Sequence, residues 1–323
     1  MPAGARLTVV GENIIDLVPI GVSTSDYRAL AGGSPANIAV AASRLGTPTA
    51  LMARVSGDVF GRRIRERLTA DCVLDTHLVP ATEPSSLAVV TFDAERRASY
   101  DFWLTGTADW QWTDAELARR LGPEVRAVHV GSIAAYREPG ASALLRMLRR
   151  ERERGAVSIT LDPNVRPAVI GGLDHARRRT AELVALADVV KASDEDLAQL
   201  YPDLDPASAA RRWLAMGPSL VLVTRGPDGA LAIGRTAEAE VPTPVIDLVD
   251  TVGAGDTFMG ALLHALDRRD LLGGQAATRL ATASAETLRE ILTVAAAAAA
   301  LNCAREGADP PTAEELAAAL HPV

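Results

Sequence analysis

The 323-residue sequence lacks several features that would assign it to a special class of protein. Its two cysteines, Cys72 and Cys303, each stand alone, so we expect neither a disulfide framework nor a cysteine-based metal cluster. No run of about 18 apolar residues occurs, and we therefore predict no membrane span. Acidic residues appear at Glu12 and Asp16, too early for a signal peptide. These absences favour a cytoplasmic protein.

Basic clusters are missing as well. The formal net charge is −8 at pH 7, and no basic block is long enough to predict nucleic-acid binding. Lys191 is the only lysine, so 32 of the 33 lysine and arginine residues are arginine. The five histidines follow no metal-ligand spacing, and His129 is expected to be a strand residue near the site. We expect a small-molecule substrate, with no nucleic-acid or membrane partner.

What the sequence does contain is a regular alternation of apolar runs and helical patterns. The apolar runs cover residues 6–11, 49–55, 127–132, 157–162, 188–193 and 220–226. Helical spacing occurs at residues 35–45, 59–69, 141–154, 175–186, 206–215 and 256–267. Nearly continuous apolar strands are typical of parallel sheets that are covered on both sides. The alternation therefore predicts a doubly wound α/β fold with a mostly parallel central sheet.

Two segments depart from this alternation and predict a small antiparallel layer beside the main sheet. Residues 13–21 have an extended pattern, and residues 85–106 read as two strands joined by a polar turn at Asp93–Arg97. Five of the 12 aromatic residues fall within 13 positions there, namely Tyr100, Phe102, Trp103, Trp110 and Trp112. This cluster is interpreted either as local core or subunit interface, or as an apolar lid over a ligand.

A glycine-rich turn leads into the last of these helices. Gly253, Ala254 and Gly255 precede Asp256, at or near which the helix is expected to start. Backbone N–H groups at a helix start bind anions, and glycine lets them approach a phosphate closely. The alternative is an ordinary tight turn in which Asp256 caps the helix. A P-loop lysine and a dinucleotide fingerprint are both absent, which leaves an anion hole with a carboxylate, suited to phosphoryl transfer.

A second glycine-containing segment lies near the amino terminus. Gly32 and Gly33 precede Ser34, which is expected to cap a helix with Pro35 in its first turn. Asn37 would then lie near the helix mouth. Its side chain either satisfies local backbone groups or binds a polyol through both amide atoms.

These two segments carry a resemblance to a known family. GGSPAN (32–37) and DTVGAGDTFMGA (250–261) resemble the signature regions of the ribokinase/PfkB family of carbohydrate kinases. GENIIDLVP (11–19), VSGDVFG (55–61), VTRGPDGA (223–230) and REGADPP (305–311) also look like that family. The resemblance extends from residue 7 to about residue 311. GTADWQW (106–112), DPNVRP (162–167) and VKASDEDL (190–197) resemble its fructokinase-like branch.

The resemblance implies one ribokinase-like domain over residues 1–323, with a β lid inserted from about 12–30 and 84–107. It implies ATP-dependent transfer to a sugar hydroxyl, with Asp256 as base and the amides of Gly253, Ala254 and Gly255 as anion hole. The implied sugar-binding residues are Asp16, Gly32, Gly33, Asn37, Phe102, Asn164 and Arg166. The implied nucleotide and Mg²⁺ side comprises Lys191, Ser193, Asp196, Thr224, Gly226 and Gly229. Asp250 and the Val252 carbonyl match the positions for a K⁺ ion.

Some positions depart from the family pattern. The family often has an Asn-x-x-Glu motif that organises magnesium and phosphate, where this chain has Ser193 and Asp196. Acid-sugar kinases usually carry a lid arginine that meets the carboxylate of the substrate. The position aligned with it here is Leu104, and burying a carboxylate against leucine is costly, so an acid sugar is disfavoured. We expect fructose or another ketohexose. Ribose, a nucleoside, 2-keto-3-deoxygluconate, a non-catalytic sugar sensor and a nicotinamide-dependent oxidoreductase stay open as alternatives. Family habit and the aromatic cluster suggest a homodimer through the lid.

Overall fold

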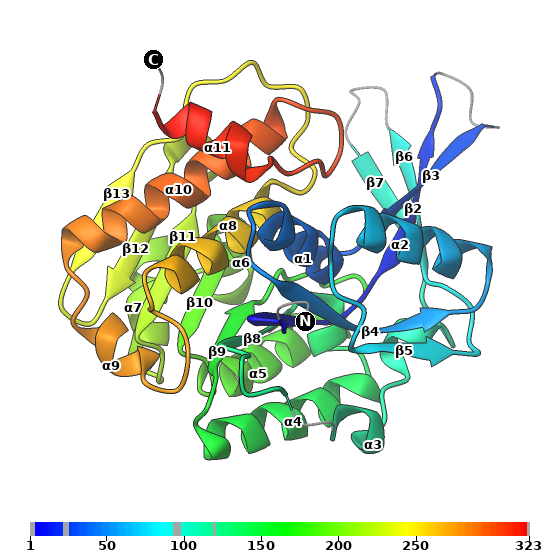
Figure 1. The fold of residues 1–323 in the computed structure, drawn as a ribbon, viewed down its shortest axis with the longest axis horizontal. Coiled ribbons are helices and arrows are strands. Elements are labelled where there is room, and N and C mark those ends of the chain that lie inside the picture. The colour runs from blue at the N-terminus through cyan, green and yellow to red at the C-terminus, as the bar shows by residue number, and fades with distance from the viewer. Residues whose placement is uncertain (1–3, 22–25, 93–97, 119–120, 322–323) are drawn as a thin grey trace.

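A computed structural model describes residues 4–21, 26–92, 98–118 and 121–321 (Figure 1). Its centre is a nine-stranded sheet in the order β13-β12-β11-β10-β9-β8-β1-β4-β5. These strands, in that order, are Glu238–Val241, Ala230–Gly234, Leu220–Thr224, Val189–Ser193, Ser158–Asp162, Ala127–Gly131, Leu7–Val10, Thr49–Ser56 and Leu78–Ala81. From β5 to β11 every neighbouring pair is parallel. The mostly parallel central sheet predicted from the apolar runs is confirmed.

The strands that the apolar runs did not reveal lie at the two edges. β12 and β13 extend the sheet in antiparallel fashion beyond β11, and β5 closes the other edge. β5 and β13 have only four residues each, and each contains both buried and more exposed residues. Every residue of β1 and β4, in contrast, is buried. The edge strands β5 and β13 are solvated on one side, so they give no continuous apolar signal, whereas the buried and apolar β12 was not recognised despite its sequence.

Helices cover both faces of this sheet (Figure 1). They are α1 (Ser34–Arg44), α2 (Val59–Ala70), α3 (Asp114–Leu117), α4 (Gly140–Arg154), α5 (Leu173–Val184), α6 (Asp194–Leu200), α7 (Pro206–Leu214), α8 (Ala254–Arg268), α9 (Ala276–Ala281), α10 (Ala285–Cys303) and α11 (Ala313–Leu320). One core cluster joins α1, α2, α8 and α10 to the sheet, and a second joins α4, α5, α6 and α7 to it. All six predicted helices are present.

A separate four-stranded sheet, here called the lid, stands beside the main body (Figure 1). Its order is β3 (Tyr27–Gly32), β2 (Ile14–Pro19), β6 (Leu87–Phe92) and β7 (Ala98–Trp103). Both outer pairs are antiparallel, whereas β2 and β6 in the middle pair in parallel. The turn expected at Asp93–Arg97 lies outside the described residues.

Close packing of α1 against α8 brings the amino-terminal ends of both helices together. A Cβ atom at Gly260 would lie 2.6 Å from Ala41 Cβ and 2.8 Å from the Ile38 carbonyl oxygen, so only glycine permits this approach. One turn nearer the amino termini, Asn37 of α1 is hydrogen-bonded to Asp256 of α8. The two glycine-containing motifs, more than 200 residues apart, therefore meet at one point.

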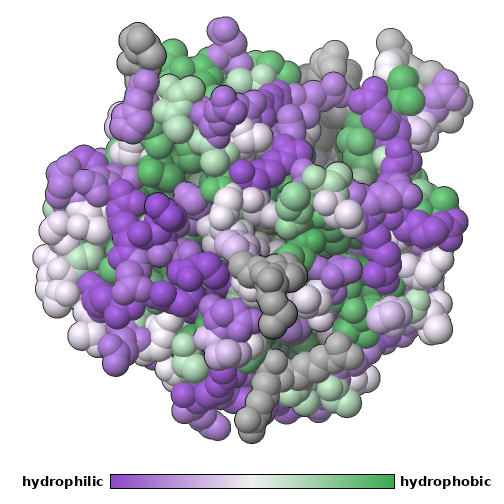
Figure 2. Space-filling model, in the orientation of Figure 1, coloured by the Kyte–Doolittle hydropathy of each residue, from purple (hydrophilic) through white to green (hydrophobic). Residues whose placement is uncertain are grey.

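Figure 2 shows hydrophilic residues over most of the face viewed, with smaller hydrophobic areas between them. In the part of the chain that the structure describes, no helix is both long and apolar enough to span a bilayer.

Candidate active site

The turn before α8 presents unbonded backbone amides. Gly253 caps the helix in the left-handed conformation, with φ 75°, and a Cβ there would lie 2.6 Å from Ala308 Cβ. Among the described residues, no acceptor is bonded to the N–H groups of Gly253 and Gly255, whereas Ala254 N–H donates to the Thr251 carbonyl at 3.2 Å. The amides of Gly253 and Gly255 sit at the positive end of the α8 dipole and are free to donate hydrogen bonds to an anion, as the sequence predicts.

The carboxylate of Asp256 lies in the first turn of α8, where both of its oxygens accept hydrogen bonds from α1. Ser34 Oγ donates to Oδ1 at 2.6 Å, and Asn37 Nδ2 donates to Oδ2 at 2.9 Å. Asp256 is therefore not the N-cap of α8, since Gly253 holds that position. The expectation that Ser34 caps α1 is also wrong, because Gly33 is the N-cap and the Ser34 hydroxyl is used on Asp256 instead.

Asn37 is almost fully buried and already engaged through both amide atoms. Its Oδ1 accepts a hydrogen bond of 3.0 Å from Arg67, while its Nδ2 donates to Asp256. An amide has two acceptor lone pairs and two N–H donors, so one of each remains for a ligand. Both amide atoms of Asn37 can therefore still meet a polyol, with one acceptor and one donor position, and this role stays a prediction.

Asp16, on lid strand β2, lies within reach of the charges of Asp256 and Arg67. Asp16 is paired with Ala88 of β6, which is in turn paired with Phe102 of β7, so Asp16 and Phe102 share one face of the lid. A Cβ at Gly32 would lie 2.4 Å from Asp16 Oδ2, so Gly32 leaves room for this carboxylate. Burial raises the pKa of Asp16 to about 6, the charge of Arg67 lowers it, and the charge of Asp256 raises it further.

A buried ion pair lies beneath the glycine turn. Lys191 Nζ donates to Asp162 Oδ2 at 2.8 Å, and both side chains are nearly inaccessible. Nζ lies 3.1 Å from the position of a Cβ at Gly255, so the only lysine of the chain stands directly beside the glycine turn. Burial raises the pKa of Asp162 to about 6 against the opposing charge of Lys191. Asp162 Oδ1 has no hydrogen-bond partner among the described residues.

Ser193 and Asp196 form a capping box at the start of α6. Asp196 N–H donates to Ser193 Oγ at 3.0 Å, and Asp196 Oδ2 accepts from the N–H and hydroxyl of Ser193 at 3.1 and 2.7 Å. Asp196 Oδ1 accepts from Val165 N–H at 2.8 Å, which ties α6 to the loop after β9. Asp196 is buried, and both of its carboxylate oxygens accept hydrogen bonds from the protein. It does so at the position where the family motif was expected to organise magnesium.

The loop after β9 presents two further predicted residues. Asn164 is half-buried with a positive φ of 41°, a conformation that asparagine tolerates better than most residues. Arg166 is exposed, and its guanidinium donates to the Val165 carbonyl at 3.0 Å. Burial raises the pKa of Tyr100 on the lid, the charges of Asp16 and Asp250 raise it further, and the charge of Arg166 lowers it.

The predicted nucleotide-side residues follow β11. Thr224 ends the strand, and its hydroxyl donates to the Ala192 carbonyl at 3.5 Å. Gly226 is exposed, whereas Gly229 is buried, and a Cβ at Gly229 would lie 2.0 Å from the Val241 carbonyl oxygen. Gly226 therefore lies on the surface of this turn, while Gly229 is required by close packing against β13.

The predicted potassium residues are joined to α10. Asp250 Oδ1 accepts from Val252 N–H at 3.0 Å, and Oδ2 accepts from Gly307 N–H at 2.8 Å. The Val252 carbonyl accepts from Asn302 Nδ2 at 2.8 Å, and Asn302 is fully buried. Within the described ranges, no group of three or more His, Cys, Asp or Glu side chains is arranged to hold a metal ion.

The aromatic cluster divides between lid and core. Trp110 and Trp112 are buried in the second core cluster, and Tyr100 stacks on Phe102 on the lid with ring centroids 6.0 Å apart. Trp103 is 56% exposed. Leu104 also belongs to the second core cluster, so it lies in the body rather than on the open lid face. The argument from Leu104 against acid sugars therefore has no structural basis.

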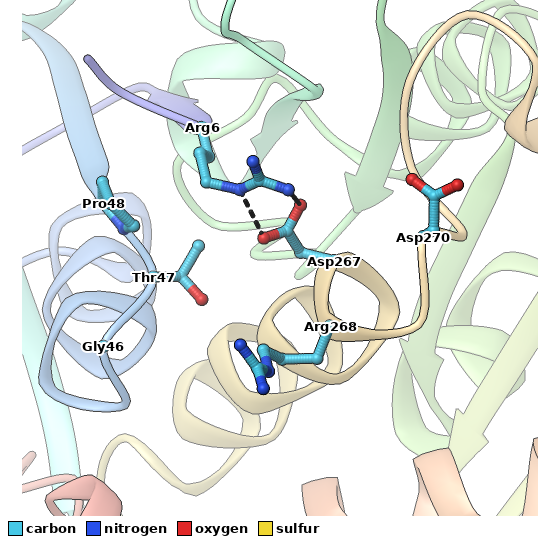
Figure 3. Close-up of a pocket in the computed structure, with 7 residues that line it drawn as sticks. All are labelled: Arg6, Gly46, Thr47, Pro48, Asp267, Arg268 and Asp270. Carbon is cyan, nitrogen blue, oxygen red and sulfur yellow. Dashed lines mark hydrogen bonds and ion pairs between the residues drawn. The ribbon is translucent and has the colours of Figure 1, made fainter. Parts of the chain in front are cut away.

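The carboxy-terminal end of α8 lines a surface pocket of about 420 Å³ (Figure 3). There Arg6 forms a two-pronged ion pair with Asp267, with both N–O distances 2.8 Å. This pocket is therefore separated from Asp256 by the length of the helix.

Comparisons with known proteins identify the family of this chain. The model of the pfkB family carbohydrate kinase matches residues 5–315. A fructokinase of Rhizobium leguminosarum bv. trifolii is 34% identical over 264 residues, which cover 81% of this chain and 80% of that protein.

Two solved structures are similar over almost their whole length. The ATP-bound fructokinase of Xylella fastidiosa superposes with a TM-score of 0.87 at 27% identity, covering 98% of both chains. The fructokinase of Vibrio cholerae, bound to fructose, ADP and calcium, has a TM-score of 0.84 at 28% identity, covering 98% of this chain and 99% of that one. The chain belongs to the pfkB family of carbohydrate kinases.

Proposed function

We propose that the sugar phosphorylated by this ATP-dependent carbohydrate kinase is fructose, and that Asp256 is its catalytic base. The observation that carries the proposal is a carboxylate held by Ser34 and Asn37 beside the unbonded amides of Gly253 and Gly255. Relatives and structural neighbours named fructokinase support the choice of sugar.

In this proposal the sugar lies between lid and body. Asp16, Asn37 and the backbone at Gly32 and Gly33 hold its hydroxyls, Phe102 covers it, and Asn164 and Arg166 complete the site from the loop after β9. Both carboxylates are half-buried, Asp256 on α8 and Asp16 on β2. Closure of the lid over the sugar would exclude water and so suppress hydrolysis of ATP.

The transfer forms one bond and breaks one. The sugar oxygen bonds to the γ-phosphorus as the bridging bond to ADP breaks, and Asp256 accepts the hydroxyl proton. The amides of Gly253 and Gly255, joined by Ala254 if its bond to Thr251 opens, stabilise the charge on the moving phosphoryl. Lys191, already beside Gly255, adds a positive charge beneath it. Thr224, Gly226 and Gly229 define the ATP side, with Ser193 and Asp196 fixing the loop behind it.

The residues present fit the two metal ions that the family uses. Mg²⁺ in kinases is typically held by phosphates and water with one or two carboxylates, and Asp162 offers an unpartnered buried oxygen near the phosphate site. Asp250 and the Val252 carbonyl supply hard oxygen ligands that keep a lone pair each, which suits K⁺. Bound there, these ions would neutralise charge on ATP.

We further propose a cytoplasmic homodimer that pairs through the lid. Tyr27, Leu30, Tyr100 and Trp103 of the lid are all exposed large side chains. The free thiol of Cys72 is exposed, which suits a reducing compartment.

The test is ADP release from ATP with fructose, ribose, 2-keto-3-deoxygluconate and a nucleoside, each with and without K⁺. We expect the highest kcat/KM with fructose, and faster turnover with K⁺ present. A higher kcat/KM with another member of the panel would overturn the assignment of fructose. Sugar binding without ADP release on any member would instead favour a non-catalytic sensor.

A further inference from the structure

Arg67 joins three parts of the molecule that the proposed reaction needs to align. It lies in the last turn of α2, and its guanidinium donates to Asn37 Oδ1 at 3.0 Å, to the Ala308 carbonyl at 3.3 Å, and to the Ala31 carbonyl. Ala31 is in lid strand β3, and Ala308 is in the loop that touches Gly253. One side chain, 20% exposed, therefore contacts the lid, a sugar-site residue and the loop at the anion hole.

The contact of Arg67 with Asn37 acts together with the bond to Asp256 to fix which way that amide faces. If the amide were reversed, its oxygen would face the Asp256 carboxylate and its NH₂ group would face the guanidinium, so both contacts would be repulsive. With Arg67 in place, Oδ1 accepts from the guanidinium and Nδ2 donates to Asp256. The orientation of one donor to the base thus depends on a residue that does not touch the base.

The loop at the anion hole is held from the same side by a second arginine. Arg44 of α1 donates to Asp309 Oδ1 at 2.5 Å and to the Pro310 carbonyl at 2.7 Å, and pairs with Asp71 at 2.7 Å. Asp71 also lies 4.0 Å from Arg67. Since Ala308 packs on the Gly253 turn, Arg44 and Arg67 together fix the protein wall against which that turn rests.

We propose that Arg67 is a positioning residue for phosphoryl transfer, which sets the Asn37 amide toward Asp256 and links the lid strand β3 to the loop at the anion hole. The inference rests on the proposed function of Asp256. A planar guanidinium reaches three fixed acceptors at once, which a lysine ammonium on a flexible stem does not. Arg67 is therefore expected to act on kcat rather than only on folding.

The experiment compares Arg67→Met with Arg63→Met, a matched change at an exposed arginine of the same helix. We expect kcat with fructose and ATP to fall at least about tenfold in Arg67→Met, roughly the effect of one charge-assisted hydrogen bond. We expect Arg63→Met to stay within about twofold of wild type. The two thermal midpoints should be similar.

A double-mutant cycle with Asn37→Ala separates positioning from a general loss of structure. If Arg67 acts through Asn37, adding Arg67→Met to Asn37→Ala should slow the enzyme much less than the two separate losses multiplied. Fully multiplicative losses, or an Arg67→Met enzyme as fast as Arg63→Met, would overturn the proposal. If Arg67→Met does not fold, Arg67→Lys decides: a lowered kcat at a normal thermal midpoint supports it, and wild-type kcat refutes it.

The activity of the wild-type enzyme distinguishes a failure of this proposal from a failure of the proposed function. A wild-type enzyme inactive with every sugar contradicts the assigned reaction. An active wild type with an unaffected Arg67→Met variant contradicts only the role of Arg67.

Discussion

Helix α8 carries an aspartate near each end, and the two are held in different ways. Asp256 in the first turn accepts hydrogen bonds from the neutral donors Ser34 and Asn37. Asp267 in the last turn is bound by the guanidinium of Arg6 through two N–O contacts of 2.8 Å (Figure 3). In the part of the chain that the structure describes, the amino-terminal carboxylate is thus oriented without a direct ion pair, whereas the carboxy-terminal one is paired with Arg6.

The helix dipole explains why the two ends differ. A negative charge is stabilised at a helix amino terminus and destabilised at the carboxy terminus. Among the described residues, Asp256 is accordingly held by neutral donors alone. Asp267 has a nearly inaccessible side chain at the unfavourable end and needs a cation. We therefore expect the amino-terminal end of α8 to act in catalysis, as proposed, and the carboxy-terminal end to contribute to stability.

The largest expected effect comes from removing the charge at the amino-terminal end. Asp256→Asn should lower kcat by about 10³-fold, the range for loss of a general base, while the fold and fructose binding persist. Asp267→Asn is the matched change at the other end and should leave kcat near wild type. Steady-state kinetics with fructose and ATP measure both. An Asp256→Asn enzyme within about tenfold of wild type would remove the distinction between the two ends.

Breaking the ion pair at the carboxy-terminal end should reduce stability instead. Arg6→Met leaves the Asp267 carboxylate without its partner, and the free energy of unfolding should fall by about 2 kcal/mol. Arg268 lines the same pocket but is exposed, so Arg268→Met should change the free energy of unfolding by less than about 0.5 kcal/mol. Urea titrations would show the difference. Equal losses in both variants would mean that the Arg6–Asp267 pair does not stabilise the protein.

A smaller kinetic effect is expected from one neutral donor. Ser34→Ala removes the 2.6 Å hydrogen bond to Asp256 Oδ1 and should reduce kcat about tenfold, with little change in the fructose KM. Ser43→Ala, in the last turns of the same helix, is the control. If both variants are equally active, orientation of the base does not depend on Ser34.

The smallest effect concerns pH. Because burial raises the pKa of Asp16 to about 6, this group becomes protonated as the pH falls through about 6, and fructose binding should weaken there. The charge of Asp256 contributes to that rise, so in Asp256→Asn the midpoint should move to lower pH. Titration calorimetry of fructose binding from about pH 5 to about pH 8 would measure this midpoint in both proteins. A shift of the same size in Asp267→Asn would show that proximity to Asp16 is not the cause.

Much of the fold was predictable because buried parallel strands are apolar along their whole length. The runs at residues 6–11 and 49–55 correspond to β1 and β4 for that reason. β3 was not recognised as a strand from its own pattern, because it alternates exposed and partly buried residues on the lid. Local pattern reports burial, and a strand of mixed exposure gives a weak signal.

The candidate site was predictable where backbone conformation requires glycine, and not where distant side chains meet. The Gly253–Asp256 turn is a local feature and was identified. Arg67 contacts Asn37 across 30 sequence positions, and Asn302 contacts Val252 across 50. Nothing in the sequence next to Arg67 or Asn302 indicates these partners. Gly260 could have been suspected as a glycine inside an apolar helix, where only a close helix contact justifies it.

The buried position of Lys191 has a consequence for labelling the protein. It supplies the only ε-amine in the chain, and only 4% of the residue is exposed. Reagents that acylate or crosslink lysine side chains should therefore leave the folded protein's side chains untouched. Reaction at Lys191 would report that the central sheet has opened.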